Sequence, residues 1–127
     1  MDKPRALIVD DEPDIIEHVG SILAKSGFEV SGTTKSREAL SLAQNKKPSV
    51  IILDICMPDL DGSELGNILQ NDSLTKDIPI VYLTGLVTKD EFGSFERMGR
   101  NYVVAKPVGY AELIEVVNKA ISGQNGC

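Results

Sequence analysis

Four short apolar runs rich in β-branched residues are spaced along the chain at intervals long enough to hold a helix. They cover residues 7–9, 50–53, 80–83 and 102–105. Uninterrupted apolar runs of this length are typical of parallel strands that are buried on both faces. A shorter alternating segment at 28–30 indicates one more strand, which would be second in the chain. The pattern therefore predicts a sheet of five parallel strands.

The segments between these runs show apolar residues at helical spacing. The first predicted helix has Pro13 near its start, and Gly27 is placed to end it in the left-handed conformation. Thr88 and Glu91 form a capping box that predicts a fourth helix. The apolar residues of that helix would be Phe92, Phe95 and Met98. Strands and helices that alternate in this way favour a three-layer α/β/α sandwich with right-handed crossovers.

Each of the four apolar runs leads into a polar residue: carboxylates follow two of them, a hydroxyl the third and an ammonium the fourth. The first is followed by Asp10-Asp11-Glu12, the second by Asp54, the third by Thr84 and the fourth by Lys106. In open parallel sheets, ligands bind outside the carboxyl ends of the strands. Carboxylates together with a lysine and a threonine can hold Mg²⁺ and bind a phosphoryl group. The pattern therefore predicts a phosphoryl-handling site at one edge of the sheet.

The acidic triplet by itself has two interpretations. Two carboxylates about 4 Å apart repel each other by roughly 4 kcal/mol at an effective dielectric near 20, so a desolvated cluster requires a cation or a protonated member. The alternative is a solvated helix start that the helix dipole favours. Asp54 supports the first interpretation, because a carboxylate beside a divalent ion can form an acyl phosphate. Thr84 and Lys106 also have ordinary roles, as a strand-end β-former and a surface lysine.

Together these segments resemble the receiver domain of two-component response regulators. The matching segments are Val9 to Glu12, Leu53 to Gly62, Leu83 to Gly85 and Ala105 to Pro107. The resemblance covers essentially the whole chain and implies a flavodoxin-like (βα)5 fold with strand order 2-1-3-4-5. We expect residues 1–122 to form this domain and residues 123–127 to be a flexible tail or the start of a linker.

The resemblance also implies the chemistry of the site. Asp54 would be phosphorylated by a phosphohistidine on a sensor histidine kinase or a histidine phosphotransfer protein. Mg²⁺ would be held by Asp11, Asp54 and the main-chain carbonyl of Cys56, with Asp10 positioning the ion through water. Self-phosphorylation and self-dephosphorylation would be the domain's only reactions, so we expect a signalling domain and not an enzyme.

The signal would then pass from the site to a protein-interaction surface. Thr84 and Lys106 would bind the phosphoryl group and draw the following loop inward. The resemblance implies that the fourth helix, fifth strand and fifth helix change their contacts with a downstream effector, an output domain or a second copy of the chain. Receivers usually carry an aromatic residue three positions before the lysine, but Val103 occupies that position and Tyr102 precedes it. A one-residue offset places a strand side chain on the opposite face, so we expect switching mainly through the loop after Thr84 and the fourth helix.

Composition excludes several other classes. The net charge is -6, from 13 basic and 19 acidic residues, which argues against a nucleic-acid surface. No apolar stretch approaches the ~20 residues that span a bilayer. The two cysteines, Cys56 and Cys127, provide no disulfide framework, and one histidine provides no zinc site. We therefore expect a cytoplasmic protein.

Two other functions are alternatives to the receiver. A Mg²⁺-dependent aspartyl phosphatase of the haloacid dehalogenase type would carry Asp-x-Asp after its first strand, whereas this chain has adjacent Asp10 and Asp11. A receiver-shaped interaction module that is never phosphorylated would have no need for the combination of Asp11, Asp54, Thr84 and Lys106. The expected receiver is a single-domain regulator or a part of a longer protein.

Overall fold

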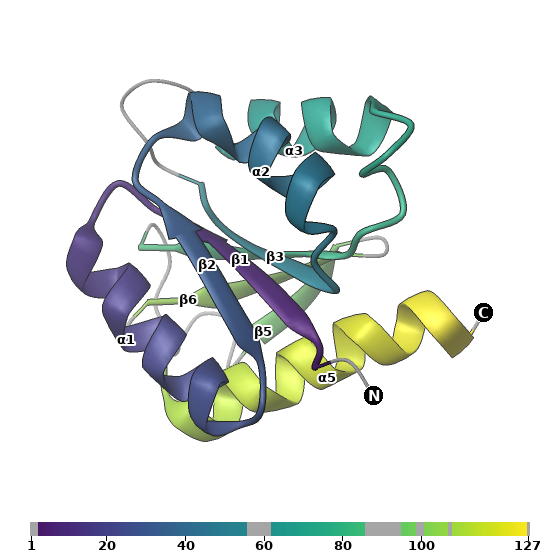
Figure 1. The fold of residues 1–127 in the computed structure, drawn as a ribbon. Coiled ribbons are helices and arrows are strands. Elements are labelled where there is room, and N and C mark those ends of the chain that lie inside the picture. Colours follow the sequence, from purple (N-terminus) through teal and green to yellow (C-terminus); the bar gives the residue numbers. More distant parts are fainter. Residues whose placement is uncertain (1–2, 56–61, 86–94, 99–100, 107, 127) are drawn as a thin grey trace.

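The computed structural model describes residues 3–55, 62–85, 95–98, 101–106 and 108–126 (Figure 1). The elements in chain order are β1 (Arg5–Val9), α1 (Pro13–Lys25), β2 (Glu29–Thr33), the 3-10 helix η1 (Ser36–Glu38), α2 (Ala39–Lys46), β3 (Val50–Asp54), α3 (Gly62–Asn71), β4 (Ile80–Thr84), β5 (Phe95–Met98), β6 (Asn101–Ala105) and α5 (Tyr110–Gly126).

The strands form one sheet in the order β2-β1-β3-β4-β6-β5. The strands β2, β1, β3, β4 and β6 are all parallel to their neighbours within this set. Because β6 is the fifth parallel strand in chain order, these five strands have the predicted order 2-1-3-4-5. At their carboxyl ends the paired residues are Val9 with Leu53, Asp54 with Leu83, and Thr84 with Ala105. Because this register aligns the ends of four strands, the residues that follow them lie along one edge of the sheet.

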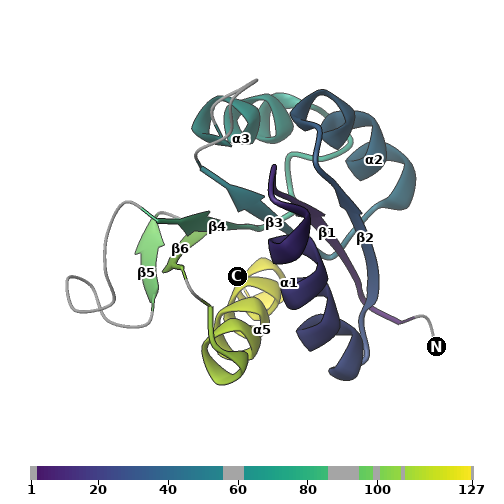
Figure 2. The same ribbon diagram turned by 90° about the vertical axis from the view of Figure 1, so that its left-hand side faces the viewer.

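Helices cover the sheet on both faces, which confirms the predicted three layers (Figures 1 and 2). One apolar cluster joins the sheet to α1 and α5, and a second joins it to α2 and α3. Every residue of β3 and β4 is buried. Each fully buried aliphatic side chain contributes roughly 1.5–3 kcal/mol, so these two clusters fix the positions of the strands that carry the site.

The first helix begins and ends as the sequence predicts. Pro13 opens α1, and Gly27 follows its end with φ 97°. The N–H of Gly27 donates to Ala24 and that of Phe28 donates to Leu23, at 3.1 and 3.0 Å. These two bonds form a Schellman motif, which satisfies helix carbonyls that would otherwise lack donors. The motif turns the chain directly into β2.

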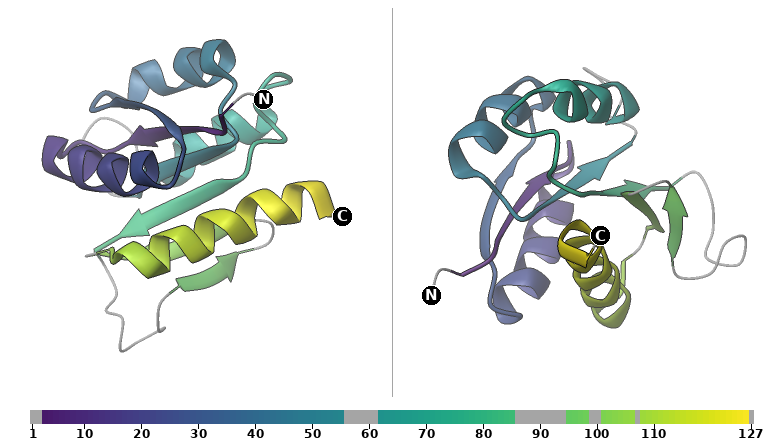
Figure 3. Two further views of the ribbon diagram at one scale, coloured as in Figure 1. Left: turned by 60° about the horizontal axis from the view of Figure 1, so that its bottom comes forward. Right: turned by 90° about the vertical axis from the view of Figure 1, so that its right-hand side faces the viewer.

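The prediction of a helix over residues 95–98 is wrong. These residues form β5, which pairs antiparallel with β6, from Phe95 opposite Val104 to Met98 opposite Asn101. Figures 2 and 3 show β5 at the lateral edge of the sheet, on the side away from β2. Only two residues separate β5 from β6 in the sequence, a length that suits an antiparallel hairpin. The free edge of β6 therefore overrides the helical spacing of Phe95 and Met98, while Thr88, Glu91 and Phe92 lie outside the described residues.

The last helix is longer than predicted. Helix α5 continues to Gly126, so the expected boundary after Ser122 falls inside it. The assignment of residues 123–127 to a tail or a linker stays a prediction. Among the described residues, none of the helices combines the length and apolar character needed to cross a bilayer.

Candidate functional site

Four of the predicted site residues lie together at the carboxyl edge of the sheet. Asp10 follows β1, Asp54 and Thr84 end β3 and β4, and Lys106 follows β6. The Asp10 N–H donates to the Thr33 carbonyl at 3.2 Å, and the Lys106 N–H donates to the Thr84 carbonyl at 2.8 Å. Main-chain hydrogen bonds between neighbouring strands thus continue past the ends of β1 and β6, and they fix the backbone positions of Asp10 and Lys106.

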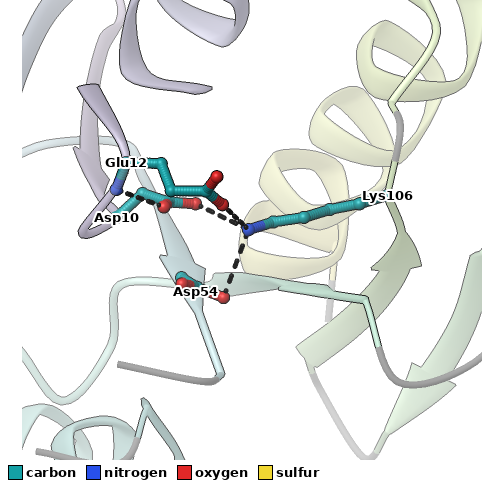
Figure 4. A network of polar contacts seen from close by, with 4 residues as sticks. All are labelled: Asp10, Glu12, Asp54 and Lys106. Carbon is teal, nitrogen blue, oxygen red and sulfur yellow. Dashed lines mark hydrogen bonds and ion pairs between the residues drawn. The ribbon is translucent and has the colours of Figure 1, made fainter. Parts of the chain in front are cut away.

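The Lys106 ammonium is the point at which the acidic groups meet (Figure 4). Its Nζ lies 3.2 Å from Asp10 Oδ2, 3.3 Å from Glu12 Oε1 and 3.5 Å from Asp54 Oδ1. The side chains of Asp10 and Asp54 are 0% and 3% exposed, that of Lys106 is 17% exposed and that of Glu12 is 62% exposed. The predicted proximity of Asp10, Asp54 and Lys106 is therefore confirmed, while their chemical roles stay predictions.

Asp10 is a buried carboxylate that can accept more hydrogen bonds than the described residues donate to it. Its Oδ1 accepts the Glu12 N–H at 2.9 Å. Its Oδ2 is buried and accepts no hydrogen bond from the described residues, although it forms an ion pair with Lys106. Burial raises the pKa of Asp10 above its ordinary value and outweighs the Glu12 N–H and Lys106, both of which lower it. A cation or an ordered water would relieve this cost.

Lys106 is held in its charged form. Burial alone would lower the pKa of the ammonium, but the attraction of Asp10, Asp54 and Glu12 together outweighs burial and raises it. One ammonium facing three carboxylates still leaves the pocket with excess negative charge when all are ionised. The arrangement is therefore suited to bind a further cation.

The acidic triplet fits a divalent ion. Asp10, Asp11 and Glu12 can each bring one carboxylate oxygen within 4.8 Å of the others, with Asp10 buried, Asp11 half-buried and Glu12 exposed. Carboxylate oxygens are the ligands that Mg²⁺ takes in proteins. The buried Asp10 Oδ2, which accepts no hydrogen bond from the described residues, points to the same kind of occupant. Cys56, whose carbonyl is the further predicted ligand, lies outside the described residues.

Thr84 lies at the end of β4 and is 4% exposed. Its neighbour across the ladder is Ala105, directly before Lys106. The hydroxyl of Thr84 and the ammonium of Lys106 therefore belong to adjacent strand ends, as predicted. The role of the hydroxyl as a phosphoryl donor partner stays a prediction.

Sequence reasoning missed the part that Glu12 plays. It counted Glu12 in the acidic triplet but assigned it no function of its own. In the structure Glu12 both hydrogen-bonds and ion-pairs with Lys106, which is distant in sequence. The available signal was weak, since a third acidic residue after Asp10-Asp11 is also what a solvated helix start would show.

The offset between Tyr102 and Val103 does place the two side chains on opposite faces of β6. Tyr102 packs against the cluster shared with α1 and α5, whereas Val103 belongs to the cluster shared with α2 and α3. Tyr82, which pairs with Val103, is also in the second cluster. The prediction that switching works mainly through the loop after Thr84 falls on residues 86–94, which lie outside the described residues.

Comparison with known proteins gives a consistent result. Residues 6–118 match the family model described as response regulator receiver domain. Protein PilH from Pseudomonas aeruginosa is 32% identical over 124 residues, covering 94% of this chain and 98% of PilH. The transcriptional regulatory protein PrrA from Mycobacterium tuberculosis is 34% identical over 123 residues, covering 97% of this chain and 52% of PrrA. The chain therefore spans almost all of one relative and about half of another.

Solved structures show the same similarity. The chemotaxis response regulator CheY4 of Vibrio cholerae matches with a TM-score of 0.79 at 27% identity, covering 94% of this chain and 99% of that chain. A putative response regulator from Chloroflexus aurantiacus J-10-fl matches with a TM-score of 0.81 at 28% identity, covering 95% and 99%. The predicted flavodoxin-like fold is confirmed.

Proposed function

Since the chain belongs to the response regulator receiver domain family, a family of signalling domains, we propose that it accepts a phosphoryl group on Asp54 in a two-component phosphorelay. The donor is a phosphohistidine on a sensor histidine kinase or a histidine phosphotransfer protein. The observation that supports this most directly is the placement of the buried Asp54 carboxylate 3.5 Å from the Lys106 ammonium, beside Asp10.

The reaction is a displacement at phosphorus. A carboxylate oxygen of Asp54 attacks, the new P–O bond forms as the P–N bond of the phosphohistidine breaks, and the imidazole leaves with the electron pair. Lys106 offers a point charge to the phosphoryl oxygens, and the Thr84 hydroxyl donates a hydrogen bond to one of them. Thr84 ends β4, which pairs with the Asp54 strand β3, and Lys106 follows β6, which pairs with the other side of β4.

Asp10, Asp11, Asp54 and the main-chain carbonyl of Cys56 are the groups that we propose hold Mg²⁺. When bound, the ion offsets the charge that accumulates on the transferring phosphoryl group. The buried Oδ2 of Asp10, which accepts no hydrogen bond from the described residues, and the closely spaced carboxylates of the triplet support this assignment. We also propose that water hydrolyses the acyl phosphate in this same site, which returns Asp54 to its free form.

Phosphorylation would act on partners through the neighbouring strand ends. The Lys106 N–H donates a hydrogen bond to the Thr84 carbonyl, so a displacement of either side chain toward the phosphoryl group would move the ends of both β4 and β6. We propose that the surface around β6 and α5 then changes its contacts with an effector protein, an output domain or a second copy of the chain. We further propose that residues 1–122 form the receiver and that the protein works in the cytoplasm.

The decisive experiment is incubation with Mg²⁺ and acetyl phosphate, followed by intact-mass measurement of the wild type and of Asp54→Asn. We expect one added phosphoryl group in the wild type, none in Asp54→Asn, and loss of labelling when a chelator replaces Mg²⁺. Equal labelling of both proteins would contradict the assignment of Asp54. Turnover of a small phosphomonoester without stoichiometric labelling would support a phosphatase instead.

A further inference from the structure

We propose that Glu12 is a positioning residue that holds the Lys106 ammonium in the unphosphorylated protein and must release it before the ammonium pairs with a phosphoryl group. The inference rests on the proposed phosphorylation of Asp54. Glu12 would thereby set how readily the Lys106 ammonium, which already lies 3.5 Å from Asp54 Oδ1, turns fully toward the phosphoryl group. The juxtaposition that carries it is the contact between Glu12 Oε1 and Lys106 Nζ at 3.3 Å (Figure 4).

The three carboxylates around Lys106 occupy different environments. Asp10 and Asp54 contact the ammonium with buried side chains, which are 0% and 3% exposed. Glu12 contacts it with a side chain that is 62% exposed. In this arrangement two buried carboxylates and one exposed carboxylate attract the same ammonium. The position of the Lys106 ammonium therefore depends on all three carboxylates, and a change in any one of them will shift it.

The backbone of Glu12 is fixed in a way that leaves its side chain for this contact. Its N–H donates to Asp10 Oδ1 at 2.9 Å, and its carbonyl accepts the N–H groups of Ile15 and Ile16 at 3.1 and 3.4 Å. Glu12 is the N-cap residue of α1, yet its side chain makes no capping hydrogen bond. A position whose side chain commonly caps the helix here contacts a residue on another strand end instead.

Glu12 is also the one of the three carboxylates that is neither phosphorylated nor among the proposed Mg²⁺ ligands. Asp54 gains the phosphoryl group, and Asp10 belongs to the proposed ion site. A phosphoryl group carries more negative charge than the carboxylate it modifies, so it competes with Glu12 for the ammonium. Weakening the Glu12 contact should therefore favour the arrangement in which Lys106 faces Asp54.

The expected size of the effect is small because Glu12 is exposed. Exposed ion pairs contribute ~0.2–1 kcal/mol, which corresponds to about a 1.4- to fivefold change in rate.

The informative pair of variants is Glu12→Gln and Glu12→Asp. The first removes the charge, whereas the second keeps it but is shorter by one methylene and loses the reach to Lys106. Glu17→Gln removes an equal charge from an exposed position on the same helix and serves as the control.

The first measurement is the ¹⁵N NMR signal of the Lys106 ammonium in protein free of metal and phosphoryl donor, assigned by its absence from Lys106→Met. We expect a shifted or faster-exchanging signal in both Glu12 variants and an unchanged signal in Glu17→Gln. The second is the initial rate of phosphorylation by acetyl phosphate, which should rise by about 1.4- to fivefold in both Glu12 variants.

An unchanged Lys106 signal in both Glu12 variants would overturn the proposal. So would a rate that rises in Glu12→Gln but not in Glu12→Asp, since this would show an effect of charge and not of contact. Failure of the proposed function would look different: the wild type would gain no phosphoryl group, although the NMR comparison would still report on the Glu12–Lys106 contact.

Discussion

Strands β3 and β4 lie in the middle of the sheet with every residue buried, whereas β5 lies at the outer edge and pairs, within the described part of the chain, with β6. In the middle, a strand has neighbours on both sides and helices on both faces, so its apolar run determines its conformation. At the edge, a segment whose apolar spacing suits a helix can instead form a strand, because the neighbouring strand offers main-chain groups for pairing. Local pattern therefore decides the first region, and tertiary context decides the second.

The largest expected effect tests the middle of the sheet. Ile52 is fully buried in β3, and Ile52→Ala should lower the free energy of unfolding by about 2–5 kcal/mol because it removes packed methyl groups and leaves a cavity. Urea denaturation followed by circular dichroism measures it, since the chain has no tryptophan. Ser122→Ala, at an exposed position of α5, is the control. A loss below ~1 kcal/mol for Ile52→Ala would contradict this account of the central strands.

The next effect tests the packing of α3 on β4. A Cβ at Gly66 would overlap the Tyr82 hydroxyl, so Gly66→Ala should destabilise the fold by about 1–3 kcal/mol despite alanine's better helix propensity. Adding Tyr82→Phe removes the hydroxyl and should restore most of the loss. If the double variant is as unstable as Gly66→Ala alone, the two side chains do not act on each other. The same denaturation assay measures both.

A third prediction concerns the pH dependence that Asp10 creates. Burial raises the pKa of Asp10 in the folded protein above 3.8, so the folded state binds more protons than the unfolded state between 3.8 and the raised value. The wild type therefore loses stability from this group as the pH rises through that window. Asp10→Asn lacks this loss, so its stability relative to the wild type should increase with pH. Denaturation in chelator at several pH values measures it; a decrease would show that the ion pair with Lys106 dominates.

The smallest expected effect tests the edge. Glu96→Pro in β5 removes one main-chain donor from a strand at the sheet edge, so at most one hydrogen bond to β6 is lost, and the cost should be below about 1 kcal/mol. Hydrogen exchange of the wild type should show protection in β6 that decreases in this variant. Nuclear Overhauser contacts typical of a helix over 95–98 would contradict the strand.

The same contrast explains how much the sequence could predict. The runs ending at Asp10, Asp54, Thr84 and Lys106 predicted both the parallel strands and their convergence, because buried parallel strands have few alternative conformations. The segment 95–98 was misassigned because its spacing suits a helix until the open edge of β6 is considered.

The contact of Glu12 with Lys106 could not be predicted either. It depends on the direction of a side chain at the start of α1 and on a partner that a long stretch of sequence separates from it. The spacing of apolar residues carries no information about such a direction. The assignment of Asp11 and Cys56 as ligands also depended on family resemblance and not on the pattern itself.

The 2.8 Å bond between the Lys106 N–H and the Thr84 carbonyl has a consequence for evolution. It joins main-chain atoms, so no substitution other than proline at 106 removes the donor. Side chains at these two positions can be exchanged while the separation of their α-carbons is preserved. Sequences that diverge from this one can therefore change the side chains at positions 84 and 106, and with them the chemistry of the site, while the backbone spacing between the two positions stays the same.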